Sequence, residues 1–245
     1  MRLFILLVLL SLAQVGAAQS SRAANPERPT VATHAYAVAP GYWELEQGIV
    51  ARGVRSLGEA TSWDLNLKVG LARGWQLGVS GTAYGRTGSG SGVGDLGIAL
   101  KWRGDLTTTT AVGVVPSVTL PTGSQDVGLS AGRALGALVG VVSVDVAPAW
   151  HADINLGPTA IGAGKPQWFG STGVTWSWGA AALTTELFGF TEGGVAPALA
   201  GALVAVLITP GEWVVVDVGG VWGATSQTSD QVFVGLTTNL GRLFE

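Results

Sequence analysis

The sequence predicts an all-β fold, a transmembrane antiparallel up-and-down β-barrel of about twelve strands. Charged residues make up only 12% of the 245 residues, and the mean hydropathy is +0.42, values that suit a membrane protein. The apolar residues are nevertheless dispersed along the chain, and 38 glycines and ten tryptophans are typical of many short strands with tight turns. Short segments also alternate apolar and polar side chains, as the lipid-facing and lumen-facing sides of a barrel strand require.

The first eighteen residues predict a cleaved export signal. Arg2 supplies a positive start, residues 3–15 are almost wholly apolar, and residues 16–18 are small. The apolar stretch is shorter than the roughly 20 residues that a membrane-spanning helix needs. We therefore expect residues 1–18 to be a signal peptide that directs the chain to the bacterial outer membrane.

The next stretch, residues 19–41, differs in composition from the rest of the chain. It carries Pro26, Pro29 and Pro40 among small and polar residues. Prolines at this density disfavour both helix and central strand, so we expect an extended periplasmic lead-in without a core of its own. The barrel domain is then expected to cover residues 42–245.

Strict alternation is clearest at residues 63–69. One face carries Trp63, Leu65, Leu67 and Val69, and the other carries Asp64, Asn66 and Lys68. Similar patterns predict further strands at 43–51, 75–84, 95–103, 110–120, 134–146, 150–156, 167–178, 180–190, 197–208, 212–222 and 231–240. Short and longer connections alternate between them, and an even strand count places both termini on the periplasmic side.

Two segments fit this pattern less well. Residues 193–209 are uncharged, which leaves a membrane-spanning helix as an alternative to a strand at 197–208. Pro197 and Gly201 disfavour that helix, and we interpret the segment as a strand with small apolar inward residues. The chain end is atypical because Glu245 follows Phe244, and the last strand is predicted from its pattern alone.

Tryptophan gives an independent check on the strand ends. The indole ring favours the membrane interface, where the ring is buried while its N–H stays hydrated. All ten tryptophans fall near an end of a predicted strand, as an interface girdle requires. They are Trp43, Trp63, Trp75, Trp102, Trp150, Trp168, Trp176, Trp178, Trp213 and Trp222.

The predicted inward faces define a candidate lumen lining. Its members are Glu44, Glu46, Asp64, Asn66, Lys68, Gln76, Asp95, Lys101, Arg103, Asp145, His151, Asp153, Glu186 and Asp217. Acidic residues outnumber basic ones in this set, so a water-filled lumen would prefer cations or neutral solutes. The alternative is that these charges pair with one another across a closed interior.

Other chemistries find little support in the sequence. The chain has no cysteine, which excludes disulfides, thiolate metal sites and a lipid-modified cysteine. The glycine pattern at residues 92–97 matches a dinucleotide-binding motif, but a flexible loop precedes it and a strand follows. His34 and His151 are the only histidines, and no nucleophile-elbow motif occurs. We assign no catalytic residue, no cofactor and no metal site, and a site built on His151 and Asp153 would need an unidentified third ligand.

Four stretches together resemble a known family. They are APGYWELE at 39–46, GVGDLGIALKWR at 92–103, PSVTLPTG at 116–123 and DINLGP at 153–158. This combination resembles the outer-membrane β-barrel family named for the meta-pathway of phenol degradation, many members of which are labelled as transporters. The resemblance implies a conduit for small, often aromatic or hydrophobic compounds, and it carries over no catalytic or ligand-binding residue.

The function expected from these features is passive passage of small solutes through an outer-membrane barrel. One alternative is a non-conducting structural or adhesion barrel, whose lumen would be plugged. A second is a lipid-modifying enzyme that would need His151 or a serine at the lipid boundary. The expected partners are membrane lipid and small solutes. The formal net charge of −3 excludes a basic nucleic-acid footprint, and the oligomeric state stays open.

Overall fold

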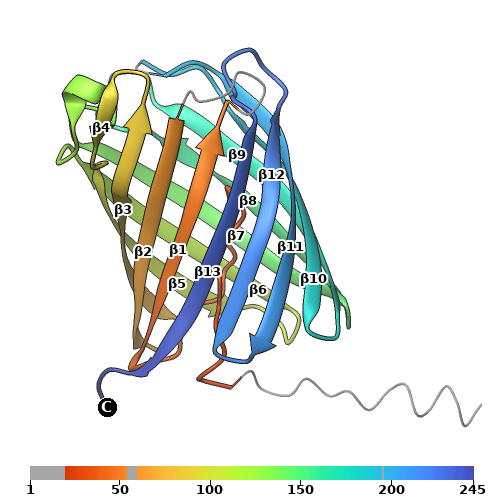
Figure 1. The fold of residues 1–245 in the computed structure, drawn as a ribbon. Coiled ribbons are helices and arrows are strands. Elements are labelled where there is room, and N and C mark those ends of the chain that lie inside the picture. The colour runs from red at the N-terminus through yellow and green to blue at the C-terminus, as the bar shows by residue number, and fades with distance from the viewer. Residues whose placement is uncertain (1–19, 54–59, 195) are drawn as a thin grey trace, which may run out of the picture.

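The computed structural model describes residues 20–53, 60–194 and 196–245, so the signal peptide expected at 1–18 lies outside the described residues. From Tyr42 onward the chain forms one antiparallel sheet that curls into a barrel (Figure 1). Its strands are β1 (Tyr42–Arg52), β2 (Ala60–Ala72), β3 (Trp75–Thr87), β4 (Gly90–Gly92), β5 (Leu96–Asp105), β6 (Thr110–Leu120), β7 (Leu135–Ala147), β8 (Trp150–Thr159), β9 (Gln167–Trp178), β10 (Ala181–Phe190), β11 (Leu199–Gly211), β12 (Val214–Gly223) and β13 (Gln231–Arg242). The 3-10 turn η2 (Gln125–Val127) lies between β6 and β7.

The barrel closes because β1 pairs with the last strand, β13, as well as with β2. The short β4 and the longer β5 both pair with β3, so they share one position in the wall. The wall therefore has twelve strand positions, which confirms the predicted closed antiparallel barrel. Closure leaves no strand edge with unpaired main-chain groups, the condition for a sheet inside a bilayer.

The uncharged segment near residue 200 is a strand. Residues Leu199–Gly211 form β11, which pairs with β10 on one side and β12 on the other. The alternative of a membrane-spanning helix here is wrong, and among the described residues no helix is long and apolar enough to cross a membrane. Leu203 and Ala205 are buried on the inner face of β11, so the weak alternation reflects apolar side chains on both faces.

The outer surface carries a broad band of exposed apolar side chains. Nine of the tryptophans are exposed on this surface at or near strand ends, namely Trp63, Trp75, Trp102, Trp150, Trp168, Trp176, Trp178, Trp213 and Trp222. Trp43 is half-buried near the start of β1. Trp150 and Trp176 stack across β8 and β9 with their ring centroids 6.0 Å apart. Such a surface is suited to contact with lipid.

The inner face is only partly polar. Val50, Leu203, Ala205, Val221 and Phe233 form a buried apolar cluster on β1, β11, β12 and β13. Because these positions face inward, this part of the barrel is packed like a protein core rather than filled with water.

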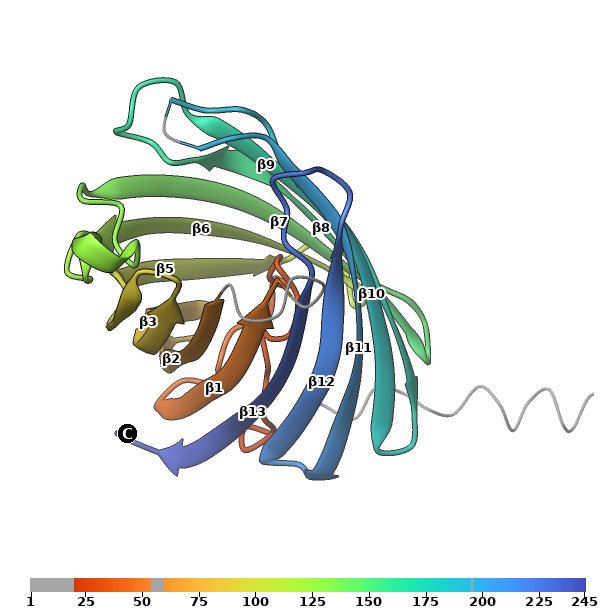
Figure 2. The ribbon, with the colours of Figure 1, turned by 45° about the horizontal axis from the view of Figure 1, so that its top comes forward.

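Residues 20–40 run inside the barrel, where Figure 2 shows the N-terminal stretch within the ring of strands. Residues 19–41 were expected to form an extended periplasmic lead-in, whereas the structure attaches residues 20–40 to inward-facing side chains of the wall. The physical reason is that its main-chain groups, which pair with no neighbouring strand over most of their length, bond to polar side chains of the strands instead. We call residues 20–40 the lumenal segment.

Candidate functional site

The lumenal segment enters beside the turn between β11 and β12. The N–H of Ala24 donates to the carbonyl oxygen of Glu212 in that turn, at 2.7 Å. Asn239 of β13 donates from Nδ2 to the carbonyl oxygens of Ser21 and Ala23, each at 3.4 Å. These bonds fix the point at which the chain passes into the barrel.

A buried ion cluster holds the segment at Asn25. Lys68 of β2 is fully buried, and its Nζ lies 3.0 Å from Oε2 of Glu44 and 2.7 Å from Oε1 of Glu46. The same ammonium donates to the carbonyl oxygen of Asn25 at 2.5 Å, while the N–H of Asn25 donates to Glu44 at 3.0 Å. One lysine thus compensates two carboxylates that would be costly to bury alone.

Arg28 occupies a notch that two glycines create in the inner wall. Gly48 of β1 and Gly235 of β13 are register partners, and a Cβ on either would overlap the Arg28 guanidinium. Asp217 lies next to this notch, with its Oδ1 3.5 Å from Nη2 of Arg28. The guanidinium carbon also lies 5.9 Å from the ring centroid of Phe233. Glycine is required at both positions because no side chain fits beneath the arginine.

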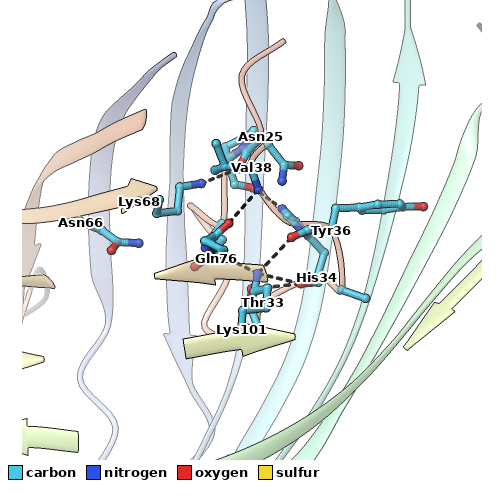
Figure 3. Close-up of polar contacts among 12 residues, drawn as sticks. Asn25, Thr33, His34, Tyr36, Val38, Asn66, Lys68, Gln76 and Lys101 are labelled. Atoms are coloured by element: carbon cyan, nitrogen blue, oxygen red, sulfur yellow. Dashed lines mark hydrogen bonds and ion pairs between the residues drawn. The ribbon is translucent and has the colours of Figure 1, made fainter. Parts of the chain in front are cut away.

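Lys101 of β5 carries the second buried ammonium group. Figure 3 shows it bonded to the part of the segment that runs back toward β1. Its Nζ lies 2.5 Å from Oε1 of Glu27 and donates to Oγ1 of Thr33 at 2.8 Å. It also donates to the carbonyl oxygens of His34 and Tyr36, at 2.9 and 3.3 Å. Four contacts from one side chain therefore fold the segment back on itself inside the barrel.

The middle of the segment is bound through its main chain. The N–H groups of Val31 and Ala32 donate to the two carboxylate oxygens of Glu186, at 2.8 and 2.9 Å. Asn155 accepts the N–H of Thr33 at 3.2 Å and donates to its carbonyl oxygen at 2.8 Å. These side chains make the pair of bonds that a neighbouring strand would otherwise supply.

The bonds continue along the returning chain. The N–H of Ala35 donates to Oγ of Ser143 at 2.8 Å, and the N–H of Val38 donates to Oε1 of Gln76 at 3.0 Å. Pro40 then forms a bridge to Gly70 of β2, just before β1 begins.

Burial and neighbouring charges shift the pKa values of two titratable groups in the segment, His34 and Glu27. Desolvation, together with the nearby Lys101 ammonium, lowers the pKa of His34 to about 4. His34 is therefore neutral at pH 7, and its Nε2 lies 3.0 Å from the carbonyl oxygen of Pro26, which it contacts as a donor. Burial opposes the charge on Glu27, but the Lys101 and Lys68 ammonium groups outweigh it and hold the pKa of that carboxyl well below its usual range.

A second polar cluster surrounds His151 of β8. Its Nδ1 lies 2.7 Å from Oδ1 of Asp145, and its Nε2 lies 3.1 Å from Oδ1 of Asp153. Ser143 donates to the same Asp153 oxygen at 2.5 Å, and Tyr36 of the segment donates to Asp145 at 3.2 Å. The serine hydroxyl is thus bonded to a carboxylate rather than to the histidine, unlike a nucleophile activated by a base.

Cavities remain on two sides of the segment. One of about 320 Å³ lies between residues 27–33 and the wall. Its wall includes polar Asn66, Ser80 and Ser117 and apolar Val115, Val139 and Phe169. Another, of about 560 Å³, is lined by residues 37–40 together with Arg73, Gly74, Arg103 and Asp105.

The structure brings most of the predicted lumen residues to the segment or its surroundings. Those that bond to the segment are Glu44, Glu46, Lys68, Gln76, Lys101, Asp145, Glu186 and Asp217. Arg103 packs over the ring of Tyr36 at 4.5 Å, and Asp64 and Asn66 lie near Arg52 and Glu46 respectively. Asp95 lies apart from them and accepts the N–H groups of Gly123 and Ala131 in the loop that follows β6.

Several functional residues were not predicted, notably the segment itself and Ser143, Asn155 and Asn239 on the wall. Asn155 continues the series of His151 and Asp153 at every second position of β8, a signal that was available. Ser143 lies two positions before Asp145 on the same face of β7, a signal of the same kind. No local sequence pattern indicates that the segment lies inside the barrel, because its bonding partners are spread over many strands.

In the described part of the chain, no group of three or more histidine, cysteine, aspartate or glutamate residues is arranged to hold a metal ion. No family model matches the chain, and no curated protein matches it either.

Solved structures do match the fold. The COG4313 outer membrane channel from Pseudomonas putida F1 is 12% identical, with a TM-score of 0.67 over 84% of this chain and 98% of that one. The KdgM porin is 10% identical, with a TM-score of 0.57 over 80% of this chain and 98% of that one. A KdgM porin in complex with disordered oligogalacturonate has a TM-score of 0.58 at 11% identity, over 80% of this chain and 98% of that one. The chain therefore has the fold of outer-membrane β-barrels.

Proposed function

We propose that the barrel is an outer-membrane channel for the passive passage of small solutes. The observation that carries this proposal is the cavity of about 320 Å³ inside the closed wall, beside the lumenal segment. A barrel packed throughout would leave no such space. The likeness in fold to a porin and to an outer-membrane channel supports the same function.

The lining of the cavity favours solutes of mixed polarity. Val115, Val139 and Phe169 offer an apolar side, while Asn66 and Ser117 offer hydrogen-bonding groups. The resemblance to the phenol meta-pathway family points the same way, toward small aromatic compounds. Carboxylates outnumber ammonium and guanidinium groups among the inward side chains, so we propose that neutral and cationic solutes pass more easily than anionic ones.

The lumenal segment favours one rival, a non-conducting structural barrel. Its bonds to Glu44, Lys101 and Glu186 fill part of the lumen with protein. We propose no covalent chemistry, because the hydroxyl of Ser143 donates to Asp153 and is buried beneath the segment.

The deciding experiment is single-channel conductance of the full chain in a planar lipid bilayer under a salt gradient. Discrete steps with a cation-selective reversal potential are expected. Stable insertion without any conductance would favour the structural barrel, and the lumenal segment would then be its permanent plug.

A further inference from the structure

The inner wall binds the lumenal segment largely through the main-chain N–H and carbonyl groups of the segment. Between Val31 and Ala35, the hydrogen bonds to the described wall all involve a main-chain N–H or carbonyl of the segment, except that of the Thr33 hydroxyl with Lys101. Side chains of Glu186, Asn155, Ser143 and Lys101 supply the wall's half of these bonds. Main-chain recognition of this kind binds a peptide with little regard to most of its side chains.

The wall specifies a limited set of side chains in the segment, which includes Tyr36, bonded to Asp145 and packed against Arg103. Glu27 pairs with Lys101, and Arg28 occupies the glycine notch beside Asp217. Ala32 and Ala35 must be small, because both are buried. The side chain of Val31 is 40% exposed and therefore free to vary.

We propose that this inner wall is a docking surface for a peptide, which the chain's own segment occupies and which an equivalent peptide can occupy in its place. The partner that fits is a chain that can adopt the same folded-back path, with a Glu-Arg pair and small residues four and seven positions after the arginine. Its main-chain N–H groups must be free between those positions. This docking surface goes beyond the proposed function and requires no conduction.

A free peptide competes poorly with the segment in the natural protein. The segment is tethered at Tyr42, which gives it a high effective concentration at the wall. The test therefore weakens the resident segment and leaves the wall unchanged. In the full chain, Glu27→Arg with Arg28→Glu places like charges opposite Lys101 and Asp217, and every wall residue stays as it is.

Two readouts follow the segment and the added peptide separately. Occupancy by the segment is read from disulfide formation between cysteines placed at Ala35 and Gly113, whose Cβ positions lie 3.5 Å apart. Binding in trans is read from the fluorescence anisotropy of a labelled synthetic peptide with the sequence of residues 22–38, in detergent. We expect the charge-swapped variant to lose the disulfide and to bind the peptide at least about tenfold more tightly than the natural protein does.

Matched peptides and wall variants test the recognition itself. A peptide with Val31→Ser is expected to bind as well as the natural sequence, and one with Ala32→Leu and Ala35→Leu is expected not to bind. In the charge-swapped barrel, Glu186→Gln should weaken binding, because one of the two main-chain N–H groups would then face the amide NH₂, which cannot accept a hydrogen bond. Thr184→Val, on the same inner face of β10, should leave binding unchanged.

Three results would overturn the docking surface. The first is a disulfide that still forms in the charge-swapped variant, because the Glu-Arg pair would then not hold the segment. The second is an empty wall that binds no peptide. The third is equal binding of all peptides, which would show non-specific association. These two readouts test the docking surface even if the barrel does not conduct, because neither of them measures conductance.

Discussion

Ala35 of the lumenal segment is fully buried, and a Cβ built on Gly113 of β6 would lie 3.5 Å from the Ala35 Cβ. At this point the segment packs directly against the backbone of β6, because Gly113 has no side chain that would separate them. The separation of the two positions also falls within the range of about 3.5–4.5 Å found between the Cβ atoms of disulfides.

The first prediction is that Ala35→Cys with Gly113→Cys forms a disulfide on mild oxidation. The natural chain has no cysteine, so loss of both free thiols reports this bond alone. Ala35→Cys with Gly136→Cys is the control, because a side chain at Gly136 would meet Ile161 instead of the segment. Free thiols in the first pair after oxidation would show that the segment does not lie against β6.

Conductance of the cross-linked protein shows whether solutes pass while the segment is in place or only after it has moved. The cavity of about 320 Å³ lies beside the bound segment, so the oxidised and reduced forms are expected to conduct alike. Conductance that starts only after reduction would show that the segment must leave its seat before solutes pass.

The second prediction concerns the glycine notch. Gly48→Ala is expected to displace Arg28, because the added Cβ would overlap its guanidinium, and the yield of the Ala35–Gly113 cross-link should fall. Gly78→Ala is a matched control on the inner face of β3, where the added Cβ meets Asn66 Oδ1 at an ordinary 3.5 Å. Equal cross-linking in both variants would contradict the role of the notch.

The third prediction concerns the buried lysine of β2. Lys68→Met leaves Glu44 and Glu46 buried without a cation, and removing one partner of a buried ion pair costs about 3–5 kcal/mol. We expect the barrel to unfold at lower urea concentration in detergent, as measured by the gel shift between folded and boiled protein.

A triple variant tests the cause of that loss. Adding Glu44→Gln and Glu46→Gln to Lys68→Met removes the uncompensated charges, and much of the stability should return. If the triple variant is as unstable as Lys68→Met alone, lost packing rather than buried charge would explain the effect.

The strand pattern predicted the wall well because lipid and lumen select opposite side chains at every second residue. Residues 63–69 alternate for this reason, and Lys68 lies on the buried face of what proved to be β2. The alternation is weak at β11, where inner and outer faces are both apolar, and the strand could be predicted there because Pro197 and Gly201 disfavour a helix.

The position of the lumenal segment had no comparable signal. Its N–H groups at Val31, Ala32 and Ala35 bond to side chains of Glu186 and Ser143, so no two-residue periodicity was imposed on its sequence. No sequence pattern indicated that Gly48 and Gly235 make room for Arg28. They form a notch only because the first and last strands of the barrel are neighbours.

The last prediction concerns ion selectivity. Asp64 and Asp145 face the lumen in different parts of the barrel, and their side chains keep 29% and 50% of their exposure, so mobile ions can reach them. Glu44 and Glu46, in contrast, are buried against Lys68 and contribute little to the field that an ion meets. Replacing both exposed aspartates with asparagine should therefore weaken the cation preference and move the reversal potential in a salt gradient toward zero.

Glu192→Gln is the matched control, because this exposed carboxylate lies in the loop after β10 and not among the lumen residues. It should leave the reversal potential unchanged. A reversal potential that does not move in the Asp64 and Asp145 double variant would show that ions take a path away from both carboxylates. Since His151 and Tyr36 both contact Asp145, such a result would place the conducting path on the far side of the lumenal segment from that cluster.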